Sequence, residues 1–194
     1  MGTDRLEAFS DGVIAIIITI MVLDLKVPNG TSLELLRRHV LPVFVSYVLS
    51  FIILGIYWNN HHHMLRATHR INGTVLWANL HLLFWLSLFP FATGWMGENH
   101  FAKVPTATYG AVLLLAAIAY YLLQRSIIVF EGADSALQRA IGRDMKGKLS
   151  PIIYAMGIAL AFVSRWLALA AYIVVALMWL VPDRRLERRI YDQV

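Results

Sequence analysis

The chain has 194 residues, of which 59% are hydrophobic and only 15% are charged, and its mean hydropathy is +0.63. Soluble domains carry about 25% charged residues, and small ones need proportionally more polar surface. The lack of cysteine excludes a disulfide scaffold, thiol chemistry and a cysteine-ligated zinc. The formal charge of +5 does not indicate a nucleic-acid partner, because most of the charge lies between apolar runs. The composition therefore predicts an integral membrane protein.

Six apolar runs predict the helices. A membrane-spanning helix needs about 20 mostly apolar residues, and residues 71–97 and 104–124 give charge-free runs of this length. Arg165 separates two shorter runs that we interpret as two connected helices, although one span with an interfacial segment, and hence five spans, is the alternative. The predicted all-α fold is one transmembrane domain over 1–194 without a separate sensor domain. Its helices are expected at about 5–25, 40–62, 70–93, 104–125, 149–164 and 166–182.

The distribution of basic residues predicts the orientation. With six spans, twelve of the 17 Lys and Arg residues fall on the side that holds both termini. Cytoplasmic loops are enriched in Lys and Arg, so we expect a protein of the cell membrane with both termini in the cytoplasm. The connector at about 125–148 has the spacing of an interfacial amphipathic helix. Its apolar side would hold Ala136, Leu137, Ala140, Ile141 and Met145, and an arginine-rich tail (Arg184, Arg185, Arg188, Arg189) would anchor to anionic lipid.

The first helix carries charge where lipid disfavours it. Only 12 uncharged residues separate Asp11 from Asp24, which is about 18 Å of helix against a hydrocarbon core of about 30 Å. The helix must therefore extend to about 5–25, and its ionisable groups are expected to face a protein interior or a water-filled path. We thus expect this helix to lie innermost. One face holds Arg5, Phe9, Gly12, Ile16, Ile20 and Leu23 with Thr19 at its edge, whereas Ser10 and Asp11 point away. Simple packing remains the plain interpretation of such a stripe.

Three stretches resemble a known family. Residues 5–11 read Arg-Leu-Glu-Ala-Phe-Ser-Asp and match the RxxxFSD signature of the transmembrane protein 175 family of potassium channels. The stretch at 58–62, Trp-Asn-Asn-His-His, and the stretch at 77–79, Trp-Ala-Asn, resemble the same family, as do Phe84 and the Phe-Pro-Phe at 89–91. The resemblance is close over the first half of the chain, whereas the second half shares only the helix count and a short final hairpin.

The resemblance implies a homotetramer whose pore is lined by the first helix, with potassium ions as the permeant species and no other cofactor. It implies a hydrophobic constriction in place of a carbonyl filter, with Ile16 as the narrow ring, Ile20 and Leu23 further along, and Thr19 as a polar layer. Physical reasoning agrees, because an apolar ring can close a pore by dewetting. One helix per chain cannot enclose a pore, so an oligomer is required. The triplet at 108–110, Thr-Tyr-Gly, is only a superficial echo of a carbonyl filter.

The signature residues Arg5, Phe9, Ser10 and Asp11 are interpreted as a lock that fixes the tilt of the first helix. Asp11 needs a donor at membrane depth, since a paired carboxylate stays ionised at lower cost. Candidate polar partners are His61, His62 and Arg66 on the same side, together with Asn79 and His81. Arg5 as a simple cytoplasmic anchor remains an open alternative.

The histidines do not predict a metal site. Helical metal pairs are normally three or four residues apart, whereas residues 61–63 are consecutive, and His62 and His69 lie two turns apart. His81 is expected to be a buried, satisfied polar group.

Three function classes remain. The favoured one is a passive potassium channel. A secondary transporter would show helices broken near mid-membrane in paired halves, but Pro90 is expected near a helix end and no inverted repeat is visible. A non-conducting scaffold or a membrane-bound metal enzyme such as a di-iron oxidase forms the third class, and the enzyme would need several histidine clusters. We therefore do not expect an enzyme.

Overall fold

The computed structural model describes residues 2–28, 30–132, 135–141 and 144–180, with the backbone alone at Ala140 and Ile141. This part of the chain is all-α, as predicted. In chain order the helices are α1 (Thr3–Ile20, continued by a 3₁₀ turn, Met21–Asp24), α2 (Leu33–Leu35, continued by a π turn, Leu36–Val40), α3 (Leu41–Arg66), α4 (Gly73–Ser87), α5 (Phe89–Glu98), α6 (Lys103–Glu131), α7 (Ala136–Ile141), α8 (Met145–Ala161) and α9 (Arg165–Leu180).

Four of these helical stretches are long and apolar enough to cross a membrane. They are Thr3–Asp24, Leu33–Arg66, Gly73–Glu98 and Lys103–Glu131, and α9 is a shorter apolar helix. The chain is therefore a multi-pass membrane protein. The arginines predicted to anchor the tail lie outside the described residues.

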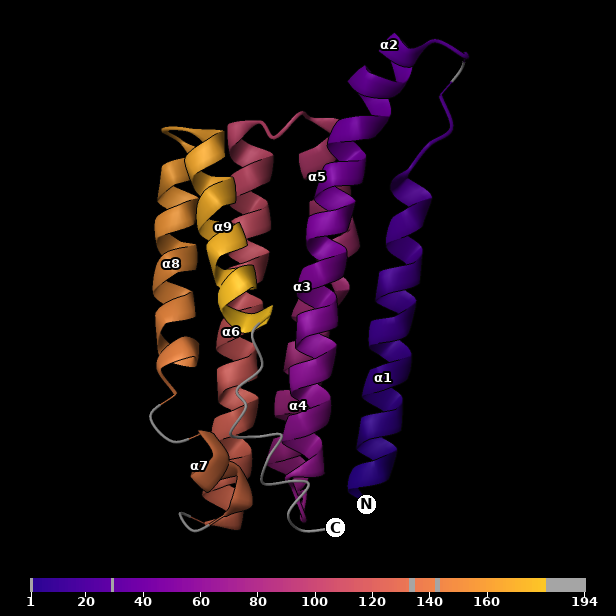
Figure 1. Ribbon diagram of the computed structural model, residues 1–194. Helices are drawn as coiled ribbons and strands as arrows, with labels where there is room; N and C mark the ends of the chain where they lie inside the picture. The colour runs from indigo at the N-terminus through magenta and orange to yellow at the C-terminus, as the bar shows by residue number, and fades with distance from the viewer. Residues whose placement is uncertain (1, 29, 133–134, 142–143, 181–194) are drawn as a thin grey trace.

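The helices form one elongated bundle in which α1 lies at one side and α8 and α9 lie at the opposite side (Figure 1). Within the bundle, α1 packs against α3, α4 and α5, whereas α6 packs against α4, α5, α8 and α9. The N-terminal end of α1 lies at the end of the bundle where α3 connects to α4 (Figure 1). The position of α1 leaves one of its sides without a neighbour in the described part of the chain.

The third long stretch is interrupted at Leu88. Asn72 caps its beginning, since its side chain accepts a hydrogen bond from the N–H of Val75 at 3.0 Å. Pro90 lies in the first turn of α5, where a missing N–H is tolerated. Pro90 therefore lies near a helix end, as expected, although α4 and α5 together form one apolar stretch that continues to Glu98.

The triplet at 108–110 belongs to the core around α6. The Tyr109 hydroxyl is fully buried and hydrogen-bonds to Ser50 of α3 at 2.9 Å, and Ser50 bonds in turn to Thr93 of α5 at 2.6 Å. A Cβ at Gly110 would collide with Tyr172 of α9, so glycine permits this close approach. The triplet therefore contributes to the packing of α6 against α3 and α9.

The connector after α6 is shorter than its predicted range, because α6 continues to Glu131. The Glu131 carboxylate accepts hydrogen bonds from the backbone N–H groups of His69 (2.5 Å) and Arg70 (3.0 Å). These contacts fix the turn between α3 and α4. Leu137 of the short helix α7 is buried, so at least one residue of its predicted apolar side packs onto protein.

Candidate functional site

Helix α1 has two different faces. The face toward the bundle contains its buried residues at spacings of three or four, namely Leu6, Ser10, Ile14, Ile17 and Met21. This spacing follows the helical period of 3.6 residues. The opposite face is exposed and contains the residues predicted to form one stripe.

The exposed stripe is mostly apolar. Its members are Arg5, Phe9, Gly12, Ile16, Thr19, Ile20 and Leu23. The exposed fraction is 58% for Ile16 and 73% for Leu23, which are large values for side chains of this type. The Thr19 hydroxyl donates a hydrogen bond to the backbone carbonyl of Ile16 at 3.0 Å. Because its hydrogen is used within the helix, the Thr19 oxygen presents its lone pairs as acceptors on the exposed face.

A buried chain of hydrogen bonds joins the packed face of α1 to α4 and α3. Ser10 Oγ donates to the carbonyl of Leu6 at 2.8 Å and accepts from Asn79 Nδ2 at 2.9 Å. Asn79 Oδ1 lies 2.8 Å from His61 Nε2, which therefore carries the donated proton. All three side chains are fully buried. His61 Nδ1 has no hydrogen-bond partner among the described residues.

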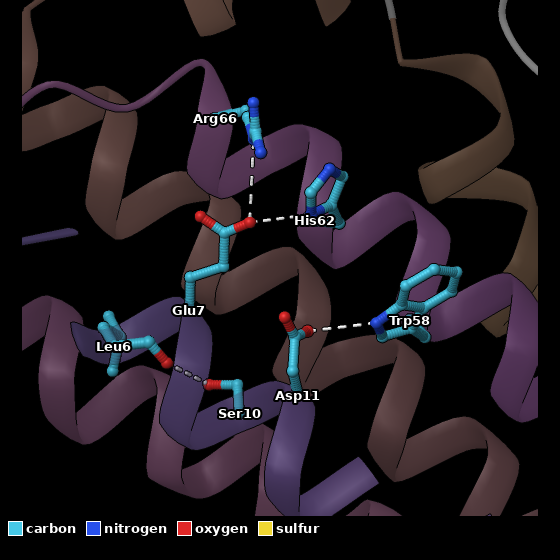
Figure 2. A network of polar contacts seen from close by, with 7 residues as sticks. All are labelled: Leu6, Glu7, Ser10, Asp11, Trp58, His62 and Arg66. Carbon is cyan, nitrogen blue, oxygen red and sulfur yellow. Dashed lines mark hydrogen bonds and ion pairs between the residues drawn. The ribbon is translucent and has the colours of Figure 1, made fainter. Parts of the chain in front are cut away.

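A second polar cluster lies between α1 and α3, at the same level of α1 as Ser10 (Figure 2). Glu7 Oε1 lies 2.7 Å from His62 Nδ1 and 3.7 Å from Arg66 Nε. Asp11 accepts a hydrogen bond from the indole N–H of Trp58 at 3.0 Å. The Trp58 and His62 rings stack with their centroids 6.1 Å apart.

These contacts correct the predicted pairing of Asp11. His61, His62 and Arg66 were the candidate donors, yet Trp58 is the donor to Asp11. The reason is geometric, because α1 and α3 run in opposite directions. A residue one turn earlier in α1, Glu7, therefore meets residues one turn later in α3, His62 and Arg66. The sequence held an indication of this pairing, because Trp58 and His62 are four residues apart, like Glu7 and Asp11.

Three other predicted site residues lie outside both clusters. Arg5 and Phe9 are exposed on the same side of α1 as Ile16. His81, expected to be buried, is exposed on α4, where Trp85 Nε1 donates to its Nε2 at 2.9 Å. The expectation of burial for His81 was wrong, since a neighbour one helical turn away satisfies this histidine at the surface.

The far end of α1 is tied by an ion pair. Lys26 Nζ lies 2.6 Å from Glu98 Oε1 at the end of α5. The hydrogen bond and the negative charge of Glu98 raise the pKa of Lys26 above its ordinary value. Both residues line an open cavity of about 490 Å³ together with Asp24 and Arg38.

The fold and the two clusters define a class, namely multi-pass α-helical membrane proteins whose first span is fastened by polar contacts along one side. The family model described as "Endosomal/lysosomal potassium channel TMEM175" matches residues 5–90. A Chryseobacterium protein named as a potassium channel is 54% identical over 192 residues, which cover 99% of this chain and 100% of the relative. The chain therefore belongs to the TMEM175 family, and the resemblance described above is confirmed.

Two further comparisons extend this result. The crystal structure of a lysosomal potassium-selective channel TMEM175 homolog from Chamaesiphon minutus matches with a TM-score of 0.78 at 29% identity, covering 93% of this chain and 97% of that one. A Danio rerio protein named endosomal/lysosomal proton channel TMEM175 is 26% identical over 135 residues, or 68% of this chain and 25% of the relative. These relatives are named as ion channels and not as enzymes, which agrees with the expectation that the chain is not an enzyme.

Proposed function

We propose that the chain is one subunit of a potassium-conducting channel in the cell membrane. The observation that carries this proposal is the division of α1 into a fastened polar side and a bare apolar stripe with one hydroxyl layer. The names of relatives that align along nearly the whole chain support potassium as the permeant ion.

The channel would be a homotetramer with α1 of each subunit around a central pore. Ile16 would form the narrowest ring, with Ile20 and Leu23 further along the same face. Such a ring blocks ions when it expels water. Thr19, with its oxygen lone pairs free, would replace part of the hydration shell of the ion beside this ring. Potassium is less strongly hydrated than sodium and would lose less there.

The same proposal includes six spans with both termini in the cytoplasm. Helices α8 and α9 have 17 and 16 residues, so each is about 24–26 Å long. Helices slightly shorter than the hydrocarbon core are accommodated by local thinning of the bilayer or by contacts with neighbouring helices. Both helices pack on α6, which is itself long enough to span.

The test is reconstitution of the purified chain into planar bilayers. With potassium on one side and sodium on the other, a reversal potential shifted toward the potassium equilibrium potential is expected. A pH gradient in symmetric potassium serves as the second arm, because some relatives are named as proton channels. A reversal potential that follows only the proton gradient, or no current at all, would contradict the proposal. Cross-linking should yield a tetramer as the largest defined species.

The polar contacts of α1 would act as a lock that sets the tilt of the pore helix. Asp11 and Trp58 form its most easily isolated pair. Asp11→Ala and Trp58→Phe should each lower tetramer yield and alter the current. If this pair acts as a unit, the double variant should be no worse than the worse single variant. Intact assembly and current in Asp11→Ala would show that the lock is unnecessary.

A further inference from the structure

The cluster of Glu7, Asp11 and His62 has a feature that the channel function does not require. One ligand-type atom from each side chain lies within 4.8 Å of the corresponding atoms of the other two. Glu7 and Asp11 are four residues apart and face the same way on α1, while His62 projects from α3 between them (Figure 2). The three groups therefore converge on one small volume from two helices.

The chemistry of the three groups is that of a metal site. Zinc binds imidazole nitrogen and carboxylate oxygen at about 2.0–2.2 Å and prefers four ligands in a tetrahedron. We propose that Glu7, Asp11 and His62 bind one divalent transition-metal ion of the zinc type, with water as the fourth ligand. Because the ligands come from two helices, the ion would join α1 directly to α3.

The groups around the three ligands leave room for a metal ion and influence its affinity. The side chains of His62 and Glu7 are only 29% and 17% exposed, and partial burial strengthens the attraction between an ion and its ligands. Trp58 occupies one lone pair of Asp11 and leaves the others available. The positive charge of Arg66, whose Nε lies 3.7 Å from Glu7, repels the metal ion and so weakens its binding. Histidine spacing alone could not reveal this site, because two of its three ligands lie on another helix.

The first test measures binding of zinc chloride to the purified full-length chain by calorimetry, with cobalt absorption as a report of ligand geometry. One ion per chain is expected. His62→Gln should weaken binding by at least about tenfold, since even the loss of an outer-shell partner costs about 10–100-fold in metal affinity. His39→Gln is the matched control, because His39 lies in the π turn before α3, near the far end of α1. Unchanged affinity and cobalt spectrum in His62→Gln would overturn the proposal.

A second variant keeps all three ligands. Arg66→Gln removes the competing cation near Glu7, so zinc should bind more tightly, by about threefold or more at low salt. Zinc should also raise the melting temperature of the wild-type chain, because it binds the folded state. Zinc affinity that stays equal or falls in Arg66→Gln would overturn the proposal, whether or not His62→Gln folds.

Discussion

The two faces of α1 solve opposite problems with the same helix. On the packed face, Ser10 is fully buried and satisfied by Leu6 and Asn79. On the other face, Ile16 is 58% exposed although it is among the most apolar residue types. The packed face thus surrounds its hydroxyl group, Ser10, with protein, whereas the other face leaves large apolar side chains bare in the single chain.

This contrast indicates how α1, which carries ionisable residues within a membrane span, can take a defined orientation relative to its neighbouring helices. Hydrogen bonds have preferred directions, so the buried chain through Ser10, Asn79 and His61 would restrict the rotation of α1 about its axis. Apolar contacts are less directional and leave the stripe free to meet another surface. The hydrogen bonds on the packed side would set the orientation of α1, and this orientation would determine which surface the exposed apolar stripe meets.

The largest effect is expected from breaking the apolar face. Ile16→Asn should raise single-channel conductance by about tenfold to a hundredfold, because a barrier lowered by about 1.4–2.8 kcal/mol gives these factors. That energy is comparable to the cost of hydrating one large apolar side chain. Potassium preference should weaken at the same time. Ile173→Asn is the control, since Ile173 is also exposed but lies on α9. Equal currents in both variants would show that Ile16 does not line the pore.

Breaking the polar face should reduce stability. Asn79→Leu leaves Ser10 without its donor and His61 Nε2 without its acceptor. Buried groups that lose a partner cost about 1–3 kcal/mol of unfolding free energy. Thermal unfolding in detergent, followed by circular dichroism, should show a clear fall in melting temperature. Asn99→Leu changes an exposed asparagine and should leave the melting temperature nearly unchanged.

A smaller effect would sharpen the role of the single hydroxyl in the stripe. Thr19→Ala should reduce the potassium-to-sodium permeability ratio by about threefold, which corresponds to about 0.6 kcal/mol. Thr19→Ser retains the hydroxyl and should retain most of the ratio. The measurement is the reversal potential under bi-ionic conditions. A ratio in Thr19→Ala that equals the wild-type value would assign selectivity elsewhere.

The smallest effect concerns the ion pair at the far end of α1. The pKa of Lys26 is raised in the folded state, so the pair stabilises the fold fully below the ordinary value of 10.5. This contribution disappears as the pH rises through the higher folded-state pKa. The melting temperature of the wild-type chain should therefore fall more steeply above pH 10.5 than that of Lys26→Met. Because the pair is exposed, the difference should be slight, and a steeper fall in Lys26→Met would contradict this account.

The sequence predicted the faces of α1 well, because a period of 3.6 residues assigns faces without knowledge of the partner. It did not predict that Trp58 would pair with Asp11, since that contact depends on the relative offset of α1 and α3. The exposure of His81 was missed for a different reason. Its partner, Trp85, lies one turn away on the same helix, so burial was not needed to satisfy its ring.

The boundaries of the later helices were less accurate than those of α1. Arg125 marked the predicted end of α6, yet the helix continues to Glu131, whose carboxylate accepts hydrogen bonds from the turn after α3. A charged residue ends a charge-free run in the sequence, but it need not end a helix, because the mostly apolar residues 126–130 continue α6 beyond Arg125.

The stretch from Leu33 to Arg66 is 34 residues long, or about 51 Å at 1.5 Å per residue. The hydrocarbon core is only about 30 Å thick, and α2 projects beyond the end of the neighbouring helices (Figure 1). The other end of this stretch carries Trp58, His62 and Arg66, which hold α1. The stretch therefore connects a segment beyond the hydrocarbon core directly to the residues that contact α1. An antibody or protein that binds α2 would therefore contact the same helical stretch whose opposite end contacts the first helix.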